Sequence, residues 1–173
     1  QASAIAPPAD AVDPAVAEAL GRIRRYGEGC DWRGWDPYDA LTSPFAGALT
    51  LGTPLGRRLL TQAVKLSPVN LRPLLRIPKA WNAKAVALAG SGYVRLAGAG
   101  DETAADEAAR RLDWLVAHPS PGTDLAWGYH FDVQTRFFFY AAHSPNTIAT
   151  SFAASALLAS AEGYTPRSTQ LIE

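Results

Sequence analysis

One short segment, Trp127–Arg136, concentrates side chains that could do chemistry. It reads Trp-Gly-Tyr-His-Phe-Asp-Val-Gln-Thr-Arg, which places an indole, a phenol, an imidazole, a carboxylate, an amide and a guanidinium close together. Such a mixture suits a loop that lines a cavity and offers both ring faces and hydrogen bonds to a ligand. The candidate site residues of this segment are Trp127, Tyr129, His130, Asp132, Gln134 and Arg136.

Three aspartates are candidate acid/base groups. Asp132 could act as a general acid or base, or hold a sugar hydroxyl. In a helix it would instead pair with Arg136, four residues further on. Asp36 and Asp39 stand on either side of a Pro-Tyr pair, where capping or turn formation is the simpler role. One of them together with Asp132 could also form the two-carboxylate arrangement of a glycosidase.

Aromatic rings near these aspartates could stack on pyranose rings, but the same rings also serve as core anchors. Both interpretations stay open for Trp127, Tyr129, Trp35 and Tyr38. Asn146 most simply caps a helix that starts at Thr147, and the start of that helix would also favour an anionic group of a ligand.

His130 is the expected partner of Asp132 in proton transfer. Zinc binding by His130 and His143 would need further ligands, and no phosphate loop, nucleophile elbow or dinucleotide motif is present. We therefore expect neither a metal nor a cofactor. Arg72 and Arg76 could contact acidic sugars or phosphate, but the simpler expectation is that both are solvated.

Start signals and apolar spacing predict the helices that position these residues. Asp13-Pro14, Thr53-Pro54 and Asp101 each combine a capping residue with a suitable first turn. Helices are predicted over 13–26, 53–66, 71–76, 79–97, from 101 onward, and over 147–162. The short turn at 98–100 predicts an antiparallel αα-hairpin. The only β-like run is 136–142, as a short strand or an extended segment.

Each long helix should bury one apolar stripe. The expected stripes are Leu55, Leu59, Ala63 and Leu66; Trp81, Ala85, Leu88, Gly92 and Leu96; Ala104, Ala108, Leu112 and Leu115; and Ile148, Phe152, Ala156 and Ala159. The predicted fold class is all-α, with long functional loops.

Composition narrows the classes of partner and the domain organisation that the chain can have. The chain has 173 residues, of which 48% are hydrophobic, and its sixteen basic and sixteen acidic side chains cancel. A zero net charge predicts neither nucleic-acid binding nor a polybasic face for anionic lipid. Cys30 stands alone, so the chain cannot form an internal disulfide. We expect a flexible N-terminal arm over 1–12, a single helical domain over 13–173, and no transmembrane span.

Several motifs occur in a set order along the chain. They are Gly34–Ser43, Pro68–Leu75, Ile77–Lys79, Trp127–Asp132 and Ser144–Thr147. This order resembles bacterial proteins of polysaccharide and glycolipid gene clusters, often labelled prenyltransferase-like or squalene-cyclase-like. The resemblance covers nearly the whole chain after about residue 20. It implies an (α/α) toroid of helical hairpins, of which this chain would be the N-terminal half.

The sequence also departs from that family. His130 stands where a proline is more usual, and Val133 stands where a tryptophan is. The acidic cluster that a triterpene cyclase needs to protonate an alkene is missing. The resemblance therefore supports a fold, and a fold does not fix a function.

The leading hypothesis is a carbohydrate-directed protein of bacterial cell-surface polysaccharide or glycolipid metabolism, possibly with acid/base chemistry on the glycan. Whether it would be a lyase, a hydrolase or an epimerase stays open. The alternatives are a non-catalytic glycan-binding or assembly protein and a prenyl-lipid binding or cyclase-like protein. Expected partners are an oligosaccharide or glycolipid, and a second chain or self-association that completes the toroid. The expected location is the bacterial cytoplasm, with a cleaved signal peptide as the alternative.

Overall fold

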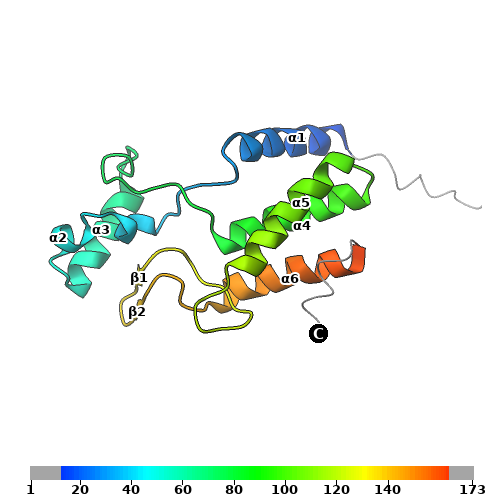
Figure 1. Ribbon diagram of the computed structural model, residues 1–173. Coiled ribbons are helices and arrows are strands. Elements are labelled where there is room, and N and C mark those ends of the chain that lie inside the picture. Colours follow the sequence, from blue (N-terminus) through cyan, green and yellow to red (C-terminus); the bar gives the residue numbers. More distant parts are fainter. Residues whose placement is uncertain (1–12, 164–173) are drawn as a thin grey trace, which may run out of the picture. The chain divides into compact units, whose positions relative to one another are not determined.

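The computed structural model describes residues 13–163 and is mostly helical, in agreement with the predicted all-α class (Figure 1). The chain divides into two compact units, with the boundary between Trp32 and Arg33. The expected arm over 1–12 lies outside the described residues. Among the described residues, no helix is both long enough and apolar enough to cross a membrane.

The first unit is built around one helix, α1 (Pro14–Gly29). The Asp13 carboxylate accepts the backbone N–H of Ala15, and Pro14 occupies the first turn, as the sequence predicted. The helix runs one turn beyond the predicted end at Tyr26. It ends where Trp32 folds back to donate its backbone N–H to the Gly27 carbonyl.

The centre of the second unit is formed by α4 (Ala83–Gly98), α5 (Glu102–Ala117) and α6 (Thr147–Gly163). α4 and α5 form the predicted αα-hairpin, and α6 packs mainly on α4 (Figure 1). Asn82 caps α4, and Asp101 caps α5 through the N–H groups of Thr103 and Ala104. Small side chains allow this close packing, because the facing positions are mostly alanine.

The predicted apolar stripe is correct for α5 and wrong for α4. Ala104, Ala108, Leu112 and Leu115 are all buried in α5. In α4 the buried residues are Ala83, Val86, Ala87, Ala89, Gly90, Tyr93 and Val94, while Leu88 is half exposed. In α6 the buried residues include Ala149, Ala153, Ala156 and Leu157, and Ile148 points outward. α4 packs against helices on two sides, so its buried face is wider than one stripe.

A smaller group of elements consists of η1 (Asp39–Thr42), α2 (Ala46–Thr50) and α3 (Pro54–Leu66), of which η1 and α2 were not predicted. Thr53 caps α3 through the N–H of Gly56. The predicted stripe of α3 is wrong, because Leu55, Leu59 and Leu66 are exposed. The side of α3 that packs inward is marked instead by Thr61 and Val64.

The predicted helix over 71–76 is a single turn. Leu75 donates its backbone N–H to the Leu71 carbonyl, but Arg76 then adopts a positive φ of 52°. Pro73 and Pro78 bracket this point and cannot extend a ladder of helical hydrogen bonds. Residues 67–82 therefore form a connection without helix between α3 and α4.

Candidate functional site

The chemistry-bearing segment is one arm of a long hairpin. β1 (Val133–Gln134) pairs antiparallel with β2 (Phe139–Tyr140). Behind the strands the two arms stay in contact, because His143 donates its backbone N–H to the Tyr129 carbonyl at 2.6 Å. Asn146 donates in the same way to the Trp127 carbonyl at 2.9 Å. The segment 127–134 therefore runs alongside 139–146, and its residues are held by backbone bonds rather than by a helix.

Trp127 anchors this hairpin in the core. Its side chain is 2% exposed, and its indole N–H donates to the Leu115 carbonyl of α5 at 2.9 Å. The backbone N–H of Trp127 donates to the Thr150 hydroxyl of α6. The proposed role of Trp127 as a sugar-stacking platform is therefore wrong for this structure, since a buried ring has no free face to offer.

Asp132 and Arg136 do not form the pair that a helix would have produced. The Asp132 carboxylate accepts the backbone N–H of Ala142 at 2.7 Å and so ties the two arms of the hairpin together. The Arg136 guanidinium lies 5.4 Å from the centre of the Phe137 ring at the exposed end of the hairpin. This bond gives Asp132 a structural role, and its acid/base role stays a prediction.

Asp36, Asp39 and Arg72 form a buried clamp. Asp39 is 1% exposed, and one of its carboxylate oxygens accepts the Arg72 Nε at 2.8 Å while the other accepts the backbone N–H of Asp36. Arg72 also donates to the Asp36 carbonyl. The Asp36 carboxylate accepts the N–H of Tyr38, which makes the predicted turn. The expectation that Arg72 is solvated is wrong.

Burial is the main influence on the pKa of Asp39. Loss of solvent raises the pKa of Asp39 above its ordinary 3.8, and the hydrogen bond and positive charge of Arg72 act in the opposite direction. The backbone N–H of Asp36 also lowers the pKa, and the charge of the Asp36 carboxylate raises it. With one oxygen on a cation and the other on an amide, Asp39 shapes the turn and is poorly placed to attack a substrate.

Trp35 and Tyr38, on either side of Asp36 in the sequence, contact different neighbouring segments. The indole N–H of Trp35 donates to the Ile77 carbonyl at 2.9 Å, next to the bridge between Gly34 and Ala80. The Tyr38 hydroxyl accepts the Lys65 ammonium of α3 at 2.7 Å. Trp35 is therefore a partly buried anchor, while the more exposed Tyr38 keeps a ring that a ligand could reach.

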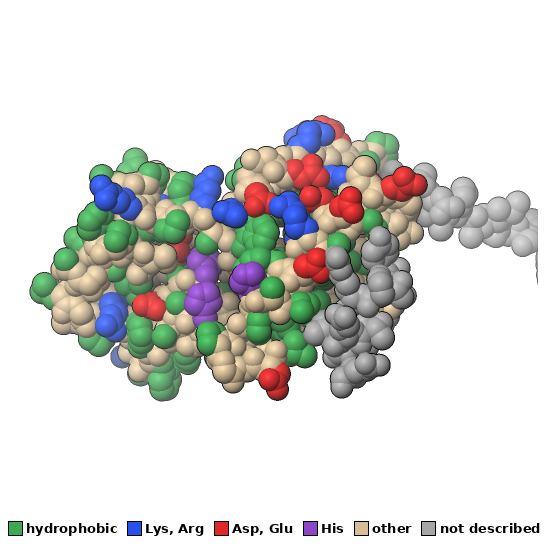
Figure 2. Space-filling model, in the orientation of Figure 1, with side chains coloured by type: hydrophobic (Ala, Val, Ile, Leu, Met, Phe, Trp, Pro, Cys, Tyr) green, Lys and Arg blue, Asp and Glu red, His purple; other side chains and the backbone are tan. Residues whose placement is uncertain are grey.

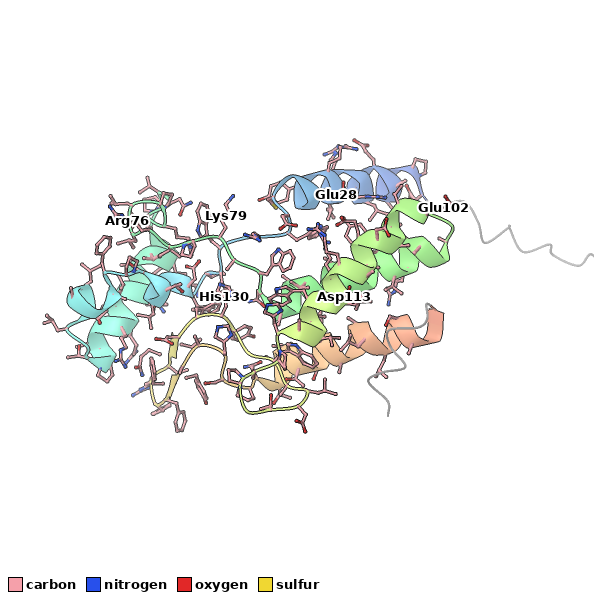
Figure 3. The ribbon with its side chains drawn as sticks, viewed as in Figure 1. Glu28, Arg76, Lys79, Glu102, Asp113 and His130 are labelled. Carbon is pink, nitrogen blue, oxygen red and sulfur yellow. The ribbon has the colours of Figure 1, made fainter. Side chains whose placement is uncertain are left out.

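His130 is one of several polar groups that the described part of the chain leaves unsatisfied; Thr42, Ser120 and Gln134 also carry such an atom. Its Nδ1 is buried and has no hydrogen-bond partner, and its ring meets Phe131 edge-on at 5.0 Å. It lies between the hairpin and the segment that carries η1 (Figure 3). Burial lowers the pKa of His130 below 6.5; the nearby Asp36 carboxylate opposes this shift, and His143 adds to it. The imidazole is therefore neutral at pH 7.

The remaining candidates have clear local roles. The side-chain amide oxygen of Asn146 accepts the N–H groups of Ile148 and Ala149, so Asn146 caps α6 as predicted. The Gln134 amide donates to the Thr135 and Phe138 carbonyls inside the hairpin turn, and its own oxygen is buried without a partner. Tyr129 stacks on Phe131 at 5.4 Å and stays partly accessible.

The structure thus brings His130 and Asp36 within electrostatic reach of each other and assigns the other candidates mainly to holding the loops. Histidine side chains gather near the middle of the face in Figure 2. No group of three or more His, Cys, Asp or Glu side chains that could hold a metal ion occurs within residues 13–163. Sequence reasoning missed Arg72 and Lys65, because no local spacing shows which partner a distant cation will find.

Comparison of the chain with protein-family models, curated proteins and solved structures finds no match.

Proposed function

We propose that this chain is a carbohydrate-directed protein that binds a sugar or the sugar headgroup of a glycolipid beside His130. The observation that carries this proposal is the buried Nδ1 of His130, which has no partner in the protein. Buried polar atoms are nearly always hydrogen-bonded, so each exception needs an explanation, and at His130 a ligand would supply the partner. A sugar hydroxyl can supply the missing donor or acceptor, and the rings of Tyr38 and Tyr129 offer partly accessible faces near this turn and hairpin.

The proposed chemistry is proton transfer by His130. A neutral imidazole can accept a proton from a hydroxyl or from an acidic C–H at neutral pH. The Asp36 carboxylate favours the charged form of His130, so it would stabilise the imidazolium that proton transfer produces. This assignment moves the acid/base role from Asp132 to His130, with Asp36 as the supporting carboxylate. A non-catalytic glycan-binding protein would use the same contacts without turnover.

Histidine NMR on the whole chain tests this proposal. We expect the pKa of the His130 imidazole to lie below 6.5. We also expect the NMR signals of its ring to shift when a ligand from a panel of sugars binds. The panel contains neutral oligosaccharides, acidic oligosaccharides and a glycolipid headgroup. His130→Gln should weaken binding by about tenfold or more, because a hydrogen bond to a buried group is lost.

His118→Gln is the matched control, since the exposed His118 ring stacks on Trp114 of α5 and serves no proposed ligand. It should leave affinity unchanged. Turnover that disappears in His130→Gln supports an enzyme, and binding without turnover supports a glycan-binding protein. If no sugar moves the His130 signals, or if His118→Gln weakens binding equally, the proposed site is wrong.

We also propose that α4, α5 and α6 belong to an (α/α) toroid completed by another copy or a second chain. In support, α4 is already flanked by its antiparallel partner α5 and by α6, as in stacked helical hairpins. Leu88 and Leu158 remain largely exposed on α4 and α6. Multi-angle light scattering should therefore show self-association of this chain, weakened by Leu158→Ser. A monomer at every concentration rules out self-completion.

A further inference from the structure

Helix α3 turns its apolar stripe toward solvent. Leu55 is 62% exposed, Leu59 is 61% exposed and Leu66 is 72% exposed. Arg58 stands three residues after Leu55 and therefore lies on the same side of the helix. An exposed stripe of leucines that carries arginine is typical of a helix that lies in a membrane interface.

The tip of the hairpin is a second exposed apolar surface. Phe137, Phe138, Phe139 and Tyr140 are consecutive and all exposed, with Phe137 76% exposed. The hairpin lies against a side of α3 away from the leucine stripe, because Arg57, two residues after Leu55, places its guanidinium 4.5 Å from the centre of the Phe139 ring. We call the area formed by Arg57 and the tip Arg136–Tyr140 the α3–hairpin surface.

The charge of this region differs from that of the whole chain. Residues 40–100 contain no acidic side chain, and the eight basic ones are Arg57, Arg58, Lys65, Arg72, Arg76, Lys79, Lys84 and Arg95. Among the described residues, Arg72 pairs with the Asp39 carboxylate and Arg57 lies over the Phe139 ring. The zero net charge of the whole chain therefore hides an uneven distribution of charge along the sequence. Figure 2 shows basic side chains among hydrophobic ones over α2 and α3.

Basic and aromatic groups are also paired directly on this surface. Arg57 lies over Phe139, and Arg136 lies over Phe137 at 5.4 Å. In such pairs the ring can enter the boundary of the acyl chains while the cation stays at the level of the lipid phosphates. The acidic residue within the hairpin is Asp132, whose carboxylate accepts a hydrogen bond from the N–H of Ala142.

We propose that the α3–hairpin surface docks on an anionic lipid bilayer. Phe137 and Phe138 enter the interfacial region, and Arg57 and Arg136 contact lipid phosphates. Anionic lipid fits better than nucleic acid, because consecutive exposed phenylalanines gain free energy in an apolar phase and gain little along a phosphate backbone. It fits better than a second copy, because two copies would bring the same basic residues together.

Cosedimentation of the whole chain with vesicles tests the proposal. The chain should bind vesicles of phosphatidylcholine plus phosphatidylglycerol, bind phosphatidylcholine alone much more weakly, and lose binding as salt rises. The double variant Phe137→Ser, Phe138→Ser should lower partitioning about tenfold or more. Arg57→Gln and Arg136→Gln should each lower it about fivefold.

Matched controls come from helices α4 and α5. Val116→Ser removes an exposed valine of α5, Arg95→Gln removes an exposed arginine of α4, and neither should change vesicle binding. Arg57 is half-buried and the other variants are at exposed positions, and equal melting temperatures will show that each is folded. The proposal is overturned if vesicles do not bind, if neutral and anionic vesicles bind equally, or if the controls lose binding as strongly as the tip variants. Preferential binding of a DNA oligomer, or a dimer split by the phenylalanine variant, would also overturn it.

Discussion

Gly128→Ala should lower the free energy of unfolding by about 3 kcal/mol or more. Gly128 lies between the two backbone bonds that hold the arms of the hairpin together, and a Cβ added there would overlap the Ser144 carbonyl oxygen. The colliding atoms are backbone, so no side chain can swing away. Relief requires the arms to separate, which strains the bonds from Asn146 to Trp127 and from His143 to Tyr129.

Urea unfolding followed by circular dichroism measures this effect. Gly92→Ala is the matched control, because Gly92 lies inside α4 and a Cβ added there meets nothing within 4 Å. Alanine at that position should stabilise the chain by about 0.5–1 kcal/mol through helix propensity. Equal stability changes for the two variants, or a Gly128→Ala protein as stable as the parent, would show that the hairpin arms are not packed as described.

Local chemistry made the positions of the helices predictable, but it did not determine which face of each helix is buried. Capping at Asp13, Thr53, Asp101 and Asn146 is encoded within a few residues, and the structure contains each of these caps. Which face of a helix is buried depends on the elements that pack against it. An apolar stripe was assumed to face the core, which holds for α5 and fails for α3, whose leucines face outward.

The residue types of the candidate site could be predicted, but most of their contacts could not. The sequence pointed to His130 and Asp36, yet the partner of Asp39 is 33 residues away at Arg72, and no spacing rule connects them. The close approach at Gly128 likewise depends on a carbonyl from another segment. The basic block over 40–100 was visible in the sequence, but the net charge concealed it because the acids are clustered elsewhere.

Arg72→Met should lower the free energy of unfolding by about 3 kcal/mol at pH 7. The substitution keeps most of the side-chain volume but leaves the Asp39 carboxylate buried without its cation. It also removes the donor to the Asp36 carbonyl, so the turn beside His130 should loosen and the His130 ring signals should shift. Arg76→Met, at an exposed position on the same connection, should stay within about 0.5 kcal/mol of the parent.

The pH dependence separates this effect from simple loss of packing. Burial already raises the pKa of Asp39, and without Arg72 that pKa should rise further. The folded state then holds a proton that the unfolded state releases, so stability falls as pH rises from the unfolded pKa of about 3.9 through the folded pKa. The deficit of Arg72→Met relative to the parent should therefore be smaller at pH 4 than at pH 7. Adding Asp39→Asn should recover much of the loss at pH 7, because the buried charge is then gone. A deficit that is constant with pH, or a double variant no more stable than Arg72→Met, would mean that shape rather than charge holds this turn together.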